Sequence, residues 1–159
     1  MKTTKEDPGY ALTVAVMATA DAFLRESTRL FRPHGLTAAQ YNVLNVLAGH
    51  PAGISQRELG DVLVVDRSNV TGLLDRLEKA GWVRRDDHPD DRRIYRVQLT
   101  PAGRALWAKV QPLHLAVVAQ VTNGMSRQRL VDCTTTLRKL ETAAARWVLP
   151  APLARVRRA

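Results

Sequence analysis

The chain has 159 residues, of which 45% are hydrophobic and 25% charged, enough for one domain or for one domain with long appended helices. A single cysteine, Cys133, excludes an internal disulfide and a cysteine-rich metal site. The first residues lack the apolar core of a signal peptide, and the apolar run before Asp21 is too short to span a bilayer, so we expect a cytoplasmic protein without a membrane partner.

The formal net charge of +9 favours an anionic partner, but the charge is unevenly distributed. Lys and Arg outnumber Asp and Glu by five to four in residues 1–53, by ten to nine in 54–104, and by nine to two in 105–159. Most of the excess therefore lies in the last third. Total charge does not locate a DNA-binding surface, and individual residues must do so.

Capping motifs and apolar periodicity predict helices in the first half of the chain. A long helix over 10–31 precedes two helices that begin with capping boxes, Thr-x-x-Gln at 37–40 and Ser-x-x-Glu at 55–58. A fourth helix, over 67–80, lies between the N-cap Asp66 and the glycine at 81. Its apolar residues recur at helical spacing and predict the buried face: Val70, Leu73, Leu74 and Leu77.

Two strands and another helix follow. The strands are expected in "WVRRD" and "RRIYRVQL", and in the second, Tyr95, Val97 and Leu99 alternate with polar residues, as in a half-buried antiparallel strand. Thr100 then caps a long helix, in which Pro112 predicts a kink.

Ser126 caps a last helix whose apolar residues alternate at spacings of three and four. This heptad pattern is typical of a helix that packs against another helix, so we expect a second subunit to cover it. The seam consists of Leu130, Cys133, Leu137, Leu140, Ala144 and Trp147.

Together these elements predict a mainly α protein with a small antiparallel β-hairpin (α+β), a winged helix-turn-helix with long dimerisation helices at both ends. The expected organisation is an N-terminal dimerisation helix (1–36), a DNA-binding domain (37–104), C-terminal dimerisation helices (105–149) and a basic tail (150–159).

The outward face of the helix over 67–80 is a candidate DNA-binding surface. With the apolar stripe facing the core, short polar side chains and Gly72 lie on the other side, where they could reach base edges in a major groove. An ordinary solvated helix face is the alternative. Asp75 favours that alternative because phosphate repels a carboxylate, unless Asp75 pairs with Arg76 or Lys79 or accepts from a cytosine amino group.

The charged turn at 90–93, after Pro89, is a second candidate. It is either a solvated turn or the tip of a wing whose arginine enters a minor groove, where a planar and weakly hydrated guanidinium fits.

The segments "LTAAQYNVLNVL", "SQRELGDVLVVDRSNVTGLLDRLEKAGWVRR" and "DDRRIYRVQLTPAGR" resemble the MarR family of bacterial transcriptional regulators, over about residues 10–147. The most specific part is an Asp-x-Arg element followed by a strand and Leu-Thr-x-x-Gly. The resemblance implies that Arg93 lies at the wing tip and that Asp91 braces it. The candidate DNA-binding residues are Arg67, Ser68, Asn69, Thr71, Arg76, Asp91, Arg92 and Arg93, and the candidate dimerisation residues are Leu130, Leu137, Leu140 and Trp147.

The resemblance also implies a homodimeric repressor of transcription that binds pseudo-palindromic double-stranded DNA. Such a repressor releases DNA when a small aromatic or phenolic acid enters a cleft between the dimer helices and the winged domain. Two alternatives stay open: a dimeric winged-helix module for protein interaction, and a constitutive DNA binder without an effector.

The sequence indicates no other chemistry. It has no nucleophile–base pair, P-loop or dinucleotide-binding glycine motif, so we expect neither an enzyme nor a cofactor. The four histidines are scattered without metal-ligand spacing, which predicts no metal site. Cys133 is expected to be a buried structural thiol rather than a redox switch.

Overall fold

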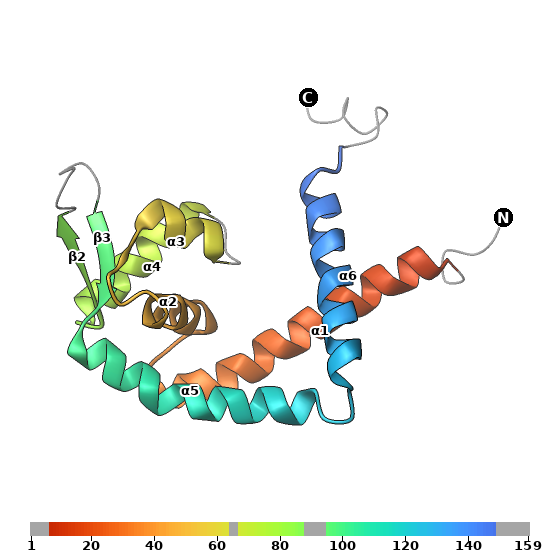
Figure 1. The fold of residues 1–159 in the computed structure, drawn as a ribbon, viewed down its shortest axis with the longest axis horizontal. Coiled ribbons are helices and arrows are strands. Elements are labelled where there is room, and N and C mark those ends of the chain that lie inside the picture. The colour runs from red at the N-terminus through yellow and green to blue at the C-terminus, as the bar shows by residue number, and fades with distance from the viewer. Residues whose placement is uncertain (1–6, 64–66, 88–94, 149–159) are drawn as a thin grey trace, which may run out of the picture. The chain divides into compact units, whose positions relative to one another are not determined.

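The computed structural model describes residues 7–63, 67–87 and 95–148, without the side chains of residues 67, 68 and 87 (Figure 1). The chain forms two compact units, residues 1–116 and residues 117–159. Among the described residues, no helix has the length and apolarity needed to cross a membrane.

The predicted fold class is confirmed, because helices dominate and the strands form one small antiparallel sheet. The elements are α1 (Pro8–Phe31), the short 3-10 helix η2 (Arg32–His34), α2 (Ala38–Ala48), β1 (Ile54–Ser55), α3 (Gln56–Val62), α4 (Arg67–Lys79), β2 (Val83–Asp87), β3 (Tyr95–Leu99), α5 (Pro101–Val121) and α6 (Arg127–Ala145).

Both predicted capping boxes are confirmed. The Thr37 hydroxyl accepts from the backbone N–H of Gln40 at 3.2 Å, and the Gln40 side chain accepts from the backbone N–H of Thr37 at 2.8 Å. Ser55 and Glu58 make the same reciprocal pair at 3.2 Å and 2.8 Å. These contacts satisfy backbone donors that the first turn of a helix leaves free, and so they fix where α2 and α3 begin.

The sheet has a third strand that the sequence did not predict. Its order is β1-β3-β2, and the two residues of β1 pair with Val97 and Arg96 of β3. Gly53 turns the chain into β1 with φ of 78°. In β3, Val97 and Leu99 are buried as expected, but Tyr95 is 52% exposed because it pairs with Asp87 at the far end of the two long strands.

The core of the first unit joins the end of α1, the helices α2, α3 and α4, the sheet and Val110 of α5. The predicted apolar stripe of α4 is buried, with exposed fractions between 0% and 7%. Burying side chains of this size contributes about 1.5–3 kcal/mol each, which holds α4 in a fixed rotation about its axis. Its polar side therefore faces away from the core.

The Leu-Thr-x-x-Gly segment ties the end of α4 to the start of α5. Gly81, with φ of 72°, follows α4, and its carbonyl accepts from the Thr100 hydroxyl at 2.6 Å. The same hydroxyl accepts from the backbone N–H of Gly103 at 3.0 Å, which confirms Thr100 as the cap of α5. A Cβ on residue 103 would lie 1.9 Å from the carbonyl oxygen of Trp82, so only glycine fits there.

Pro112 lies inside α5, which runs on to Val121. In the second unit, Ser126 caps α6 as predicted, accepting from the backbone N–H of Arg129 at 3.3 Å. The helix ends at Ala145, so the prediction that it reaches Trp147 is wrong.

None of the residues of α6, all of which the structure describes, is buried within the single chain. Cys133 is exposed in the single chain, so the expected burial of its thiol depends on a second chain and stays a prediction. Leu137 is 49% exposed, Leu140 is 37% exposed, and Trp147, beyond the helix, is 68% exposed.

Candidate nucleic-acid interface

Helix α4 presents a polar face on the side opposite its buried stripe. Of the predicted DNA-binding residues, Asn69, Thr71 and Arg76 have exposed side chains there. Arg67 and Ser68 occupy the first turn of α4, and their side chains lie outside the described residues. Small hydroxyl and amide groups on a helix can approach base edges closely, whereas an arginine can reach a base or a phosphate.

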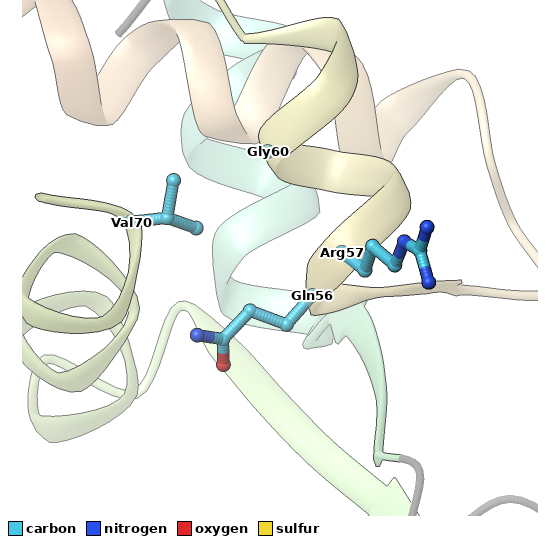
Figure 2. A pocket seen from close by; sticks show the side chains of 4 residues that line it. All are labelled: Gln56, Arg57, Gly60 and Val70. Carbon is cyan, nitrogen blue, oxygen red and sulfur yellow. The ribbon is translucent and has the colours of Figure 1, made fainter. Parts of the chain in front are cut away.

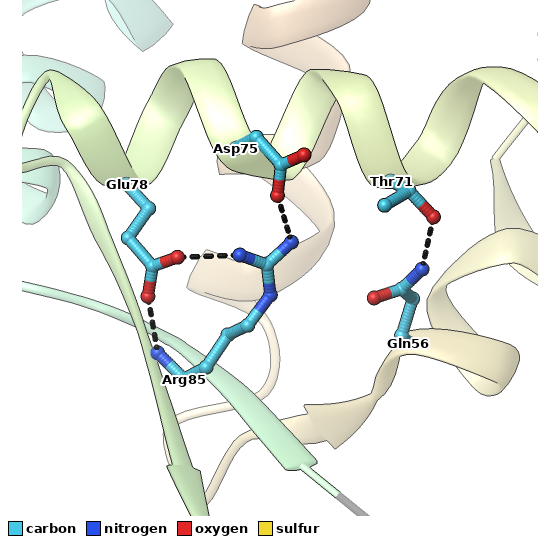
Figure 3. A network of polar contacts seen from close by, with 5 residues as sticks. All are labelled: Gln56, Thr71, Asp75, Glu78 and Arg85. Atoms are coloured by element: carbon cyan, nitrogen blue, oxygen red, sulfur yellow. Dashed lines mark hydrogen bonds and ion pairs between the residues drawn. The ribbon is translucent and has the colours of Figure 1, made fainter.

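Helix α3 supplies a residue to this face that the sequence analysis missed. The Gln56 side-chain amide donates to the Thr71 hydroxyl at 2.6 Å, and Figure 3 shows this bond bridging α3 and α4. Gln56 and Gly60 of α3, with Val70 of α4, also line a hollow of about 310 Å³. Arg57, the fourth lining residue, points its guanidinium away from Val70 in Figure 2 and is exposed. Arg57 is therefore an exposed cation on α3 that points away from Val70 of α4.

Asp75, the carboxylate of α4 that argued against DNA binding, has a partner that the sequence did not reveal. Its Oδ1 accepts from Nη2 of Arg85 at 2.6 Å, so its partner is on strand β2 and not on its own helix as expected. Arg85 also donates to Glu78 through both its backbone N–H, at 3.2 Å, and Nη1 (Figure 3). The charge of Asp75 is thus compensated within the protein.

The wing is described up to its tip. Strands β2 and β3 pair in regular register from Val83–Leu99 to Asp87–Tyr95. The predicted wing residues Asp91, Arg92 and Arg93 lie outside the described residues, between the two paired strand ends.

An aromatic junction joins the end of α1 to α2 and α5. The rings of Phe31 and Tyr41 stack with centroids 4.3 Å apart, and the Tyr41 hydroxyl lies 3.3 Å from Nδ1 of His114. Burial lowers the pKa of His114, because a cation is poorly solvated there, and burial likewise raises the pKa of Tyr41.

In the part of the chain that the structure describes, no group of three or more His, Cys, Asp or Glu side chains is arranged to hold a metal ion.

Helices α2, α3 and α4 with the antiparallel sheet define a winged helix-turn-helix protein. Residues 34–94 match the family model described as MarR family. The HTH-type transcriptional regulator TtmR of Methylorubrum extorquens (strain PA1) is 37% identical over 156 residues, which cover 94% of this chain and 79% of TtmR.

Two solved structures of similar proteins share the fold. The transcriptional repressor CouR bound to a 23-mer DNA duplex is 30% identical, with a TM-score of 0.69, and the match covers 89% of this chain and 96% of CouR. CouR from Rhodococcus jostii RHA1 bound to p-coumaroyl-CoA is 25% identical, with a TM-score of 0.74. The match covers 88% of this chain and 95% of that CouR chain. The chain belongs to the MarR family, and it is a DNA-binding transcriptional regulator.

Proposed function

We propose that this protein is a homodimeric repressor that binds a pseudo-palindromic operator and acts in the cytoplasm, where that DNA lies. The observation that carries the proposal is the polar face of α4, which the buried stripe of the same helix turns away from the core. Each subunit would insert α4 into one major groove, with half-sites centred about 10 base pairs apart.

In this proposal some protein–DNA contacts provide sequence specificity and others provide affinity. Arg67, Ser68, Asn69, Thr71 and Arg76 of α4 face the major groove, and the wing residues Asp91, Arg92 and Arg93 face the flanking minor groove. Base contacts from α4 provide specificity, whereas arginine contacts to phosphate provide most of the affinity.

Exposed apolar side chains at both ends of the chain support the homodimer. Helix α1 has 24 residues, yet Tyr10, Met17 and Leu24 on it are 48%, 68% and 61% exposed. No residue of α6 is buried within its own chain, although most helical stability in proteins comes from the packing of an apolar face. We infer that the terminal segments 1–36 and 105–149 cover each other's apolar residues in a pair of chains, with Leu130, Leu137, Leu140 and Trp147 at the contact.

Binding to a duplex carrying the region upstream of the protein's own coding sequence tests this function. Fluorescence anisotropy should show a preference for that duplex over a scrambled one and affinity that falls steeply as salt rises, because bound arginines displace counterions. Arg93→Ala and Ser68→Ala should weaken binding. Arg138→Ala, which removes a cation from the polar side of α6, is the matched control and should change binding little.

Binding that is unaffected by Arg93→Ala and Ser68→Ala would favour the alternative of a winged-helix module for protein interaction. Equal affinity for the scrambled duplex would also contradict the proposed operator.

An effector is a second part of the proposal. The junction of Phe31, Tyr41 and His114 places stacked rings and a polar pair where the winged domain meets α1 and α5, and CouR, a similar protein, binds p-coumaroyl-CoA. A small aromatic or phenolic acid would release DNA if it bound better to the DNA-incompetent arrangement of the dimer. A thermal-shift screen with such acids should find one that raises the melting temperature and weakens DNA binding. If no acid in the screen binds, the alternative of a constitutive DNA binder without an effector is favoured.

A further inference from the structure

Arg85 of β2 makes three polar contacts to helix α4. Its Nη2 donates to Asp75 at 2.6 Å, its Nη1 donates to Glu78, and its backbone N–H donates to Glu78 at 3.2 Å. In Figure 3 the side chain extends from β2 towards α4 and ends between the two carboxylates. A strand of the wing is thereby attached to the proposed recognition helix at two successive turns.

The side chain of Arg85 is more buried than those of its two partners. Its side chain is only 19% exposed, compared with 59% for Asp75 and 40% for Glu78. Burial alone would lower the pKa of the Arg85 guanidinium, but hydrogen bonds and charges from Asp75 and Glu78 outweigh it and raise that pKa. A guanidinium held by two carboxylates keeps one geometry, because its planar donors are fixed relative to each other.

The same contacts change the charge that α4 presents. Two carboxylates on a helix beside phosphates would oppose DNA, and Arg85 supplies the nearby positive charge. Arg84, the preceding residue, does not do so. It pairs with Asp86 at 3.2 Å and donates to Gln98 at 3.1 Å, both on the sheet, and its side chain is 57% exposed.

We propose that Arg85 is a positioning residue for DNA recognition: it holds the wing strand and α4 as one body and compensates the carboxylates of Asp75 and Glu78. The inference rests on the proposed DNA-binding function. It concerns a residue that acts through α4 and β2 and does not itself touch DNA.

The test is a mutant cycle in the full-length protein, using anisotropy with the upstream duplex and with its scrambled form. Arg85→Gln should weaken binding to the upstream duplex about tenfold or more, and more than it weakens binding to the scrambled duplex. Arg84→Gln removes the same charge one residue away and is the matched control. Its loss of affinity should be smaller than that of Arg85→Gln and similar for the two duplexes. Arg85→Lys, which keeps the charge without the planar fork, should recover part of the loss.

Both substitutions are then repeated in a background carrying Asp75→Asn and Glu78→Gln. The cost of Arg85→Gln should shrink there, because no carboxylate is left to compensate, whereas the cost of Arg84→Gln should stay the same. Circular dichroism at the assay temperature checks that each variant is folded, and any variant that is unfolded is measured again at a lower temperature.

Three results would overturn the inference. Equal costs for Arg85→Gln and Arg84→Gln would make Arg85 one surface cation among others. If Arg85→Gln weakens binding just as much in the protein that carries Asp75→Asn and Glu78→Gln, Arg85 must contact DNA directly. If the unaltered protein does not distinguish the two duplexes, the proposed DNA-binding function itself is wrong. The first two results, in contrast, would contradict only the role of Arg85.

Discussion

At the scale of single residues, the joint between α4 and α5 leaves no space for a side chain at position 103. A Cβ there would lie 1.9 Å from the carbonyl oxygen of Trp82, and a backbone atom cannot move aside as a flexible side chain can. We expect Gly103→Ala to lower the free energy of unfolding by about 1–3 kcal/mol, because the two segments must separate. Urea denaturation measures the change.

Gly72→Ala is the matched control for Gly103→Ala. It also adds one methyl group to a helical glycine, but the nearest heavy atom to that methyl would be Nη2 of Arg76 at 3.9 Å. Alanine favours the helix by up to about 1 kcal/mol over glycine, so the control should be neutral or stabilising. Equal losses in the two variants would contradict the packing described at the joint.

His114 gives a prediction for the dependence of stability on pH. Burial lowers its pKa in the folded chain below the ordinary value of 6.5, so the unfolded chain binds a proton more readily. The stability linked to this group is therefore complete above about pH 6.5 and is lost as the pH falls through the lower folded pKa. Urea midpoints between pH 7.5 and pH 5 should decline less in His114→Gln than in the unaltered protein. Parallel declines would show that His114 is not the group responsible.

The sequence predicted whether single residues are buried or exposed better than it predicted their interaction partners. The burial of Val70 and the exposure of Asp75 follow from helical periodicity alone. A partner for Asp75 is expected on the same helix, where neighbouring side chains are three or four residues apart. The partner, Arg85, comes from a strand whose register depends on the folded sheet, and that information is not local.

At the scale of elements, the capping box of α3 determines where the helix-turn-helix begins. Ser55→Ala removes the hydroxyl that accepts from the backbone N–H of Glu58, and we expect a loss of about 1 kcal/mol of stability. Ser55→Gly, which also removes the hydroxyl but suits the backbone conformation of a cap, should cost only about a few tenths. Urea denaturation measures both losses. No loss in Ser55→Ala would show that the hydroxyl contact is unimportant, and a loss in Ser55→Gly as large as in Ser55→Ala would contradict the expected effect of the backbone conformation.

Elements whose signals are local were predictable, and elements formed only by tertiary contacts were not. Both capping boxes and the cap at Thr100 appear where the sequence motifs place them. Strand β1 was missed because two residues carry no alternation and exist as a strand only by pairing with β3. The apolar heptads continue to Trp147, but the helix stops at Ala145, so the side-chain pattern alone did not show the end.

At the scale of the whole molecule, the proposed DNA-binding function requires the pairing of two chains. Leu137 is 49% exposed on the apolar seam of α6, and a second chain that covers it could not accept a charge there. Leu137→Glu should therefore produce monomers in sedimentation velocity experiments at concentrations where the unaltered protein is a dimer.

Thr135→Glu is the matched control, since it places the same charge on the polar side of α6, where Thr135, Arg138 and Lys139 line a shallow hollow. It should leave the dimer intact. Dissociation by both substitutions, or by neither, would contradict the proposed seam.

The arrangement of two chains on DNA is the part that a single sequence predicts least directly, because it depends on contacts between copies. Hydroxyl-radical footprinting on the upstream duplex tests it. We expect two protected segments on one face of the duplex, centred about 10 base pairs apart, one for each α4. A single protected segment, or uniform protection along the duplex, would contradict it.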